Sequence, residues 1–241
     1  GYADLEEMIR HSQLFLEMRR DCPELADADW YRQFPKERIA RQVWFNTQVT
    51  DKRTMTEYLL GAVDAHKRLK ILDFGCGIGI PAFTFAEKGH DVTAMDIQGT
   101  GTLEFLKWRC AQHGVPMTIT PSVGGVPDLG DAQYDVIVAM DCIEHIADWP
   151  GVVKALGAHL TPMGVLFSNN GILEDNLHPE HYSIDNKAFI ATCMEAGMME
   201  VPVIRADSLT EAQQREFIIK DNVGFGEWDW PVIAAEWPES V

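Results

Sequence analysis

The 241-residue sequence has no unbroken apolar run near the ~20 residues that a membrane-spanning helix requires. It also has no CxxC pair, and its cysteines are odd in number: Cys22, Cys76, Cys110, Cys142 and Cys193. Neither a disulfide framework nor a zinc–thiolate site fits that pattern. No signal-peptide pattern is visible after Gly1, so we expect a protein of the reducing cytoplasm with no membrane partner.

Basic residues are scarce, because the chain has 20 Lys and Arg against 37 Asp and Glu, a formal net charge of −17. Affinity for nucleic acid depends largely on neutralising phosphates, so we expect no nucleic-acid partner and favour a small molecule. Four basic residues lie close in the sequence, and solvated helix faces explain them more simply than a binding patch does. They are Arg38, Arg41, Lys52 and Arg53.

The first part of the chain shows apolar residues at helical spacing. This spacing predicts helices over residues 4–20, from Pro35 through Val43, and over residues 55–63. All three precede the first convincing strand. We therefore assign residues 1–66 to an N-terminal helical extension.

From residue 70, short apolar strands alternate with helices. The strands are predicted at Lys70–Phe74, Asp91–Met95, Met117–Thr120, Tyr134–Met140 and Gly164–Ser168. The helices are predicted at Pro81–Lys88, Thr102–His113, Asp148–Leu160 and Asp185–Ala196. Strands and helices in this order require right-handed crossovers, which produce a mostly parallel sheet with helices on both faces.

Two further strand candidates, Glu200–Ala206 and Glu216–Lys220, have no room for a long helix between them and could pair antiparallel at the sheet edge. The predicted fold is therefore α/β: a Rossmann-like, doubly wound, mostly parallel seven-stranded sheet over residues 67–222. The tail, residues 223–241, carries three tryptophans. We expect it to pack on the body, over the site or on a second subunit, which leaves a homodimer open.

A glycine-rich loop, Asp73-Phe74-Gly75-Cys76-Gly77-Ile78-Gly79, follows the first strand and opens a helix. Glycines let the backbone approach a ligand closely, and the helix start attracts a carboxylate or phosphate. Asp96 ends the next strand, where an acid can accept both hydroxyls of a ribose. A nicotinamide dinucleotide would call for GxGxxG, whereas this loop reads GxGxG. It is also led by Asp73, which suits a ligand that carries an ammonium group.

The loop resembles motif I of class I S-adenosylmethionine-dependent methyltransferases. Asp91–Asp96 resembles their second motif, and Tyr134–His145 resembles their fourth strand, often written FDxVxxxxxxEH. The resemblance covers about residues 55–220 and extends to small-molecule methyltransferases of the ubiquinone-pathway type. It implies transfer of a methyl group from S-adenosylmethionine to an oxygen or nitrogen of a small metabolite.

By the same resemblance, the glycine loop would face the methionine part of the cofactor. Asp96 would bind the ribose hydroxyls and Ile97 would pack on the adenine. Many relatives place an aspartate against the adenine amino group; here Ser122 or a backbone carbonyl stands in the matching stretch. The residues expected to bind the cofactor are Asp73, Gly75, Cys76, Gly77, Gly79, Asp96, Ile97, Ser122 and Met140.

The acceptor is expected beyond the carboxyl ends of the strands. The methyl donor is already activated, so the protein mainly aligns the acceptor and manages its proton. The predicted catalytic residues are Asp141, His145 and His181. The two histidines are the candidates for taking the proton, because an imidazole titrates near neutral pH. The aromatic N-terminal helices are predicted to act as a lid that shapes the acceptor pocket and excludes water.

Two alternatives stay open at this stage. Asp141, Glu144, His145 and a later histidine also resemble the metal site of small-RNA 2′-O-methyltransferases, although the same pattern occurs in metal-free relatives. The acidic charge argues against an RNA acceptor, so we predict no metal. A non-catalytic cofactor-binding module is the second alternative.

Overall fold

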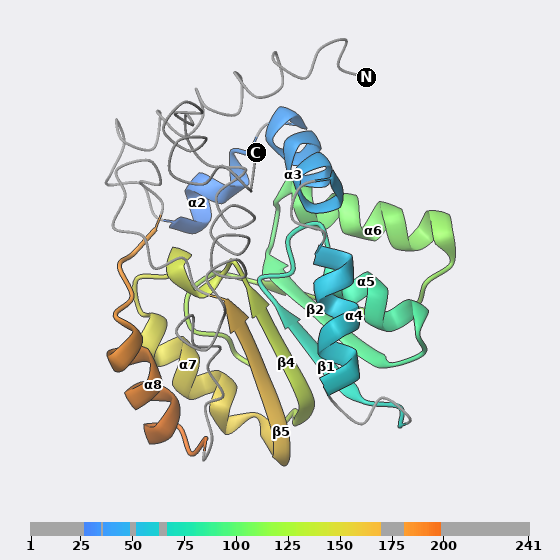
Figure 1. The fold of residues 1–241 in the computed structure, drawn as a ribbon. Helices are drawn as coiled ribbons and strands as arrows, with labels where there is room; N and C mark the ends of the chain where they lie inside the picture. Colours follow the sequence, from blue (N-terminus) through green and yellow to red (C-terminus); the bar gives the residue numbers. More distant parts are fainter. Residues whose placement is uncertain (1–26, 35, 49–51, 63–66, 170–180, 199–241) are drawn as a thin grey trace, which may run out of the picture.

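The computed structural model describes residues 27–34, 36–48, 52–62, 67–169 and 181–198 (Figure 1). Its sheet has five parallel strands: β1 (Lys70–Phe74), β2 (Asp91–Ile97), β3 (Thr118–Ser122), β4 (Tyr134–Met140) and β5 (Leu160–Asn169). Their order is β3-β2-β1-β4-β5. The Rossmann-like α/β prediction is thus confirmed. The strand order reverses between β1 and β4, and ligands bind at such a switch point.

Helices cover both faces of the sheet (Figure 1). One face carries α4 (Lys52–Ala62), α5 (Ile80–Glu87) and α6 (Gly101–His113), whereas the other carries α7 (Trp149–Ala158) and α8 (Asn186–Glu195). The strands alternate their side chains between the two cores: Ile71 points into the first and Leu72 into the second, and both are fully buried. Burial on both faces explains the nearly continuous apolar sequence of β1 and β4.

The N-terminal helices α2 (Asp27–Arg32) and α3 (Lys36–Gln48) lie over the edge toward which the strands point (Figure 1). Ile39 of α3 rests on Gly101, where a Cβ would come within 2.3 Å of the Ile39 side chain. Helix α3 runs beyond the predicted segment, and α2 was not predicted because six residues are too short for a clear period. The helix predicted over residues 4–20 lies outside the described residues.

Strands β1 and β4 have the predicted bounds, but the prediction around Leu160 is wrong. The helix α7 ends at Ala158, and β5 starts at Leu160 instead of Gly164. Between the β4 pairs at Tyr134 and Val136, the partners on β5 jump from Leu160 to Val165, so β5 bulges there. Pro162 lies within the bulge and has no N–H to donate to the ladder.

The sheet is five-stranded in the described residues, fewer than the seven strands predicted. The two strand candidates at residues 200–206 and 216–220, and the tryptophan-rich tail, lie outside the part of the chain that the structure describes. Across residues 27–34, 36–48, 52–62, 67–169 and 181–198, no helix combines the length and apolar character needed to cross a membrane.

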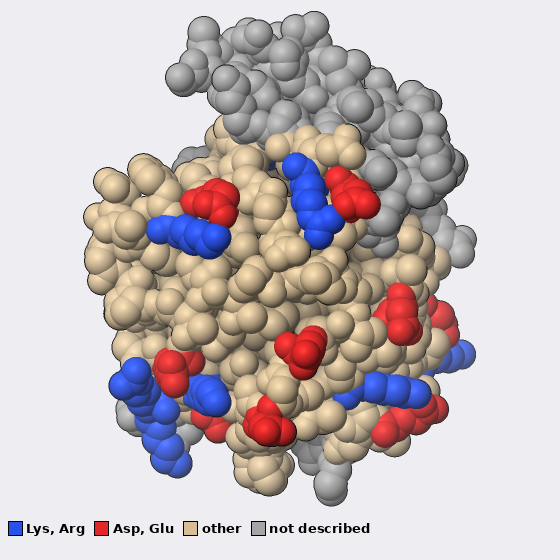
Figure 2. All heavy atoms as spheres, turned by 180° about the vertical axis from the view of Figure 1, so that it is seen from behind, with Lys and Arg blue, Asp and Glu red and all other residues tan. Residues whose placement is uncertain are grey.

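Charged side chains of opposite sign lie beside one another on the face shown in Figure 2. Ion pairs in the described residues include Arg53 with Glu57, Lys107 with Glu104 and Lys154 with Glu195. Most of these side chains are about half exposed, and the pairs contribute little to stability.

Candidate active site

The glycine loop between β1 and α5 depends on the absence of side chains. Gly75, Gly77 and Gly79 have φ values of 69°, 53° and 73°, in the left-handed region that favours glycine. A Cβ on Gly75 would lie 2.0 Å from the Sγ atom of Cys142, and one on Gly79 would lie 2.3 Å from a Leu106 methyl group. A Cβ on Gly77 would meet no atom within 4 Å. The outer two glycines are required by packing, and Gly77 leaves its backbone uncovered.

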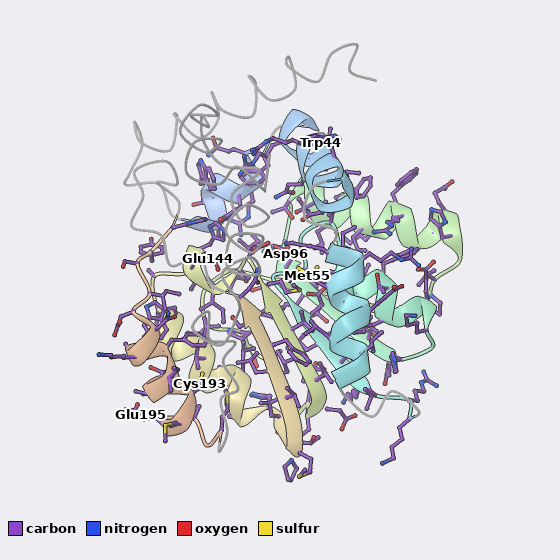
Figure 3. The ribbon with its side chains drawn as sticks, in the orientation of Figure 1. Trp44, Met55, Asp96, Glu144, Cys193 and Glu195 are labelled. Atoms are coloured by element: carbon purple, nitrogen blue, oxygen red, sulfur yellow. The ribbon has the colours of Figure 1, made fainter. Side chains whose placement is uncertain are left out.

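Asp96, at the end of β2, ties its strand to this loop (Figure 3). Its Oδ2 atom accepts a hydrogen bond from the Gly77 N–H at 2.5 Å, and its Oδ1 atom accepts one from the Ile97 N–H at 2.6 Å. Burial raises the pKa of this carboxyl, and the two hydrogen bonds act in the opposite direction. Asp96 therefore shapes the loop directly, besides its predicted part in binding ribose.

Asp73, in β1, is buried beneath the loop, with its carboxyl 2% exposed. Its Oδ2 atom accepts a hydrogen bond from the Ala82 N–H in the first turn of α5 at 2.9 Å. Burial raises the pKa of Asp73 to about 7, although this hydrogen bond and the Lys52 ammonium oppose the shift. Asp73 thus has a structural task at the helix start, and its predicted place beside the methionine ammonium stays a prediction.

The other predicted cofactor residues lie at the same edge. The Cys76 N–H donates to the Met95 carbonyl at 3.1 Å. Ile97 pairs with Ser122 across β2 and β3, and the Ser122 hydroxyl accepts a hydrogen bond from the Gly124 N–H at 3.0 Å. The structure thus brings the predicted set together at the carboxyl ends of four strands, with Met140 ending β4.

Asp141 directly follows β4 and has a φ of 49°, which is uncommon outside glycine. Its N–H donates to Asn169 Oδ1 at 2.8 Å, and the Asn169 amide donates back to Asp141 Oδ1 at 2.6 Å. The other carboxylate oxygen forms an ion pair with the ammonium of Lys52, the first residue of α4. Partial burial acts to raise the pKa of Asp141, but Lys52 and Asn169 together hold it below its usual value.

The two predicted catalytic histidines come together. The rings of His145 and His181 lie 4.5 Å apart between centroids, at 74°. Tyr31 of α2 packs edge-on against His145, with centroids 5.8 Å apart. The Tyr182 N–H donates to the Glu144 carbonyl at 2.6 Å, which holds the His181 segment beside the short 3-10 helix η1 (Ile143–His145). A ring from the N-terminal helices therefore borders the imidazole pair.

Helix α2 extends from these histidines to the loop that follows β2. Tyr31 forms an aromatic cluster with Trp30 and Phe34, whose ring centroids lie 4.8 Å and 5.1 Å from its own. On the other side, Arg32 Nε donates to the Gln98 carbonyl at 3.0 Å, two residues after Asp96. The described part of the predicted lid thus contacts both His145 and the loop after β2, and its closing role stays a prediction.

A group of three potential metal ligands exists in the described residues. Donor atoms of Glu144, His145 and His181 all lie within 4.8 Å of one another. Asp141 is outside this group, and its carboxylate oxygens meet Lys52 and Asn169. Three of the four metal ligands considered from the sequence therefore lie together, and Asp141 does not join them. That the protein needs no metal stays a prediction.

Lys52 is the site residue that the sequence placed wrongly, on a solvated helix face. Its side chain is 14% exposed and reaches Asp141 from the N-terminal extension. Nothing in the local sequence distinguishes Lys52 from Arg53, whose side chain is 59% exposed. The difference lies in which side of α4 each residue occupies, and only the packing of α4 on the sheet decides that.

Comparison with known families matches a methyltransferase domain over residues 47–196, more than half of the chain. The chain belongs to the methyltransferase-domain family. This confirms the resemblance to class I S-adenosylmethionine-dependent methyltransferases. The matched range of the methyltransferase domain begins near α4 and ends with α8, so it includes every predicted cofactor and catalytic residue.

Two relatives of this methyltransferase domain are ubiquinone biosynthesis O-methyltransferases. The one from Photorhabdus laumondii is 33% identical over 41% of each chain, and the one from Vibrio vulnificus is 33% identical over 46% of this chain and 47% of that protein. The chain thus spans less than half the length of the curated relatives that it matches. Both relatives are named for ubiquinone biosynthesis.

Solved structures show the same fold. An O-methyltransferase family protein from Burkholderia thailandensis has a TM-score of 0.59 and 10% identity, over 78% of this chain and 64% of that one. The [4+2]-cyclase SpnF has a TM-score of 0.51 and 16% identity, over 60% of this chain and 56% of that one. A cyclase among the neighbours illustrates that the fold alone does not determine the reaction.

The residues of this methyltransferase domain fit S-adenosylmethionine. Gly77 has no atom within 4 Å of the position of a Cβ, so that side of its backbone is open to a ligand, while its N–H donates to Asp96. Asp96 in β2 has the carboxyl group that two ribose hydroxyls require, and Asp73 in β1 is the predicted partner of the methionine ammonium. The cofactor would supply an activated methyl group, which these residues are predicted to orient.

Proposed function

We propose that the chain transfers a methyl group from S-adenosylmethionine to an oxygen or nitrogen of a small molecule, with a phenolic hydroxyl as the favoured acceptor. The observation that carries this proposal is the pair formed by His145 and His181 at the strand edge, bordered by Tyr31. Two imidazoles beside an aromatic wall suit a planar acceptor that must lose a proton. The names of the relatives support oxygen over nitrogen.

The chain's own groups divide the task. Tyr31, within the cluster of Trp30 and Phe34, offers apolar area against which an aromatic acceptor can lie. S-adenosylmethionine would supply the activated methyl group to the acceptor oxygen and be released as its demethylated thioether. His145 or His181 would take the O–H proton that the acceptor loses. The proton acceptor must be within hydrogen-bond reach of that O–H, which the adjacent imidazoles permit.

The test is a product assay. The chain is incubated with S-adenosylmethionine and one acceptor in each reaction. The acceptors are 3,4-dihydroxybenzoate, a monophenol and an aromatic amine, and the masses of the products are measured by mass spectrometry. We expect a singly methylated product from a hydroxylated acceptor, lost in the double variant His145→Ala/His181→Ala. If the chain binds the cofactor but methylates none of these acceptors, the non-catalytic binding module becomes the better description.

We also propose a cytoplasmic protein with a seven-stranded sheet, no nucleic-acid partner and a homodimeric assembly. The net charge of −17 supports the exclusion of nucleic acid, because phosphates would be repelled. Light scattering tests the assembly, and a filter-binding assay with RNA tests the exclusion.

A further inference from the structure

Acidic side chains from four neighbouring segments converge on the strand edge. Asp73 lies in β1, Asp96 ends β2, Asp141 follows β4 and Glu144 lies in η1. Figure 3 shows Asp96 and Glu144 at this same edge, below the N-terminal helices. The ionised members of this set create a negative potential at the strand edge, to which Asp73 contributes less because burial raises its pKa to about 7. What offsets that potential determines which ligands the crevice prefers.

Lys52 is an ammonium group that meets this set of carboxylates. It contacts Asp141 directly, and it acts through space on Asp73, since it lowers the pKa of both carboxyls. The Lys52 side chain is only 14% exposed, so solvent screens its charge less than it screens the surface lysines.

The position of Lys52 is set by a well-anchored helix. The buried Thr56 hydroxyl donates to the Lys52 carbonyl at 2.7 Å, one turn along α4. Leu60 inserts into the core with Phe85 of α5, and Arg53 pairs with Glu87 at 3.5 Å. On the other side, Asn169 holds Asp141 through two hydrogen bonds. The ion pair therefore joins two fixed points across the crevice.

The methyl donor and its product differ in charge at one atom. The donor carries a sulfonium, a permanent positive charge, whereas the demethylated product carries an uncharged thioether; the adenosine and amino-acid parts are the same. Contacts with those shared parts affect both ligands equally. The electrostatic potential at the sulfur is what separates their affinities.

We propose that Lys52 is a specificity-determining residue: by neutralising Asp141, it limits the preference of the crevice for the charged methyl donor over the uncharged product. Without this ammonium the crevice gains one negative charge and holds the sulfonium more tightly. With it, the two ligands are held more equally, which balances donor capture against product retention. This inference rests on the proposed function only through the cofactor, and it does not depend on the acceptor.

The test is calorimetric titration of the full chain with S-adenosylmethionine and, separately, S-adenosylhomocysteine, reported as the ratio of the two Kd values. We expect Lys52→Met to shift the ratio about fivefold toward the donor, and Asp141→Asn to shift it by a similar factor toward the product, as a charge roughly 8 Å away at an effective dielectric constant of roughly 40 would do. The double variant Lys52→Met/Asp141→Asn restores the original net charge, so its ratio should return near that of the unmodified chain.

Two control variants separate charge from general disturbance. Lys52→Arg keeps the charge and should leave the ratio unchanged. Lys154→Met removes a lysine whose pair with Glu195 at 2.9 Å joins α7 to α8, on the opposite face of the sheet, and should also leave it unchanged. Circular dichroism checks that every variant is folded.

The outcomes distinguish the inference from the proposed function. If Lys52→Met weakens both ligands by the same factor, Lys52 binds a group that they share, and the inference is overturned. It is also overturned if both single variants shift the ratio in the same direction. If neither ligand binds the unmodified chain, the proposed function fails and the inference fails with it.

Discussion

The carboxylate of Asp96 accepts a hydrogen bond from the backbone N–H of Gly77 at 2.5 Å, so the end of β2 and the glycine loop form one unit. Asp96 and Gly77 were expected to bind different parts of the cofactor. Their contact shows that the Asp96 carboxylate also holds the loop. A substitution at Asp96 is therefore predicted to have two effects, one on ribose binding and one on the loop itself.

For Asp96→Ala we expect cofactor affinity to fall tens-fold or more, since charge-assisted hydrogen bonds to two ribose hydroxyls are worth roughly 1.5–3 kcal/mol each. We also expect faster amide hydrogen exchange at Gly77, which loses its hydrogen-bond acceptor. Calorimetry with S-adenosylhomocysteine and hydrogen-exchange mass spectrometry measure the two effects. Unchanged affinity in the folded variant would show that Asp96 serves the loop alone.

Asp73 should make stability depend on pH. Its pKa is about 7 in the folded chain against 3.8 as an ordinary value, so the folded state retains a proton that the unfolded state has lost. The stability due to this protonated form is complete below about pH 4 and is lost as pH rises through about 7. Asp73→Asn mimics the neutral form and should raise the free energy of unfolding most at about pH 8, less at about pH 5 and little below about pH 4. Equal effects at all of these pH values would contradict a raised pKa.

His90 should act in the opposite direction. Its Nδ1 atom accepts a hydrogen bond from the Leu69 N–H at 3.2 Å, and burial, with Lys88 nearby, lowers its pKa below 6.5. The unfolded state therefore binds a proton first, and stability is lost as pH falls below about 6.5. The variant His90→Asn supplies an acceptor oxygen that does not titrate. Denaturant melts at about pH 7.5 and pH 5.5 should show a smaller loss for His90→Asn than for the unmodified chain.

Methyl transfer should survive exhaustive chelation. The donor is already activated, so no Lewis acid is needed to take the acceptor proton when His145 and His181 lie 4.5 Å apart. The assay compares product formation before and after EDTA treatment, and after addition of Mg²⁺ or Mn²⁺. Activity that disappears with EDTA and returns with either metal would mean that Glu144, His145 and His181 hold an ion.

Removal of residues 1–48 should leave cofactor affinity within a few-fold but abolish methyl transfer. Most predicted cofactor contacts come from the strand edge, whereas Tyr31 and its aromatic neighbours border the histidines. Tyr31→Ala is the milder companion variant and should raise the acceptor KM with little change in affinity for S-adenosylhomocysteine. Normal methylation of the acceptor by the shortened chain would refute the lid.

The amino-acid sequence by itself determined the fold class and the cofactor edge. Local apolar runs in β1 and β4 and the glycines of the loop are short-range signals, because strand burial and positive φ angles act within a few residues. The order of the motifs then predicted which strand ends meet. For the same reason, Asp73, Asp96 and Met140 could be assigned to one edge in advance.

Only the tertiary structure decided what Lys52 and Tyr31 contact. Both residues lie on helices. The spacing of apolar residues predicts which face of a helix is buried, but it does not predict which part of the sheet that face covers. Lys52 reaches Asp141 across 89 positions of sequence, and Tyr31 meets His145 from a helix of six residues. The bulge in β5 likewise depends on its register with β4. Long-range packing sets these contacts, because each requires the finished sheet as a surface on which the helices dock.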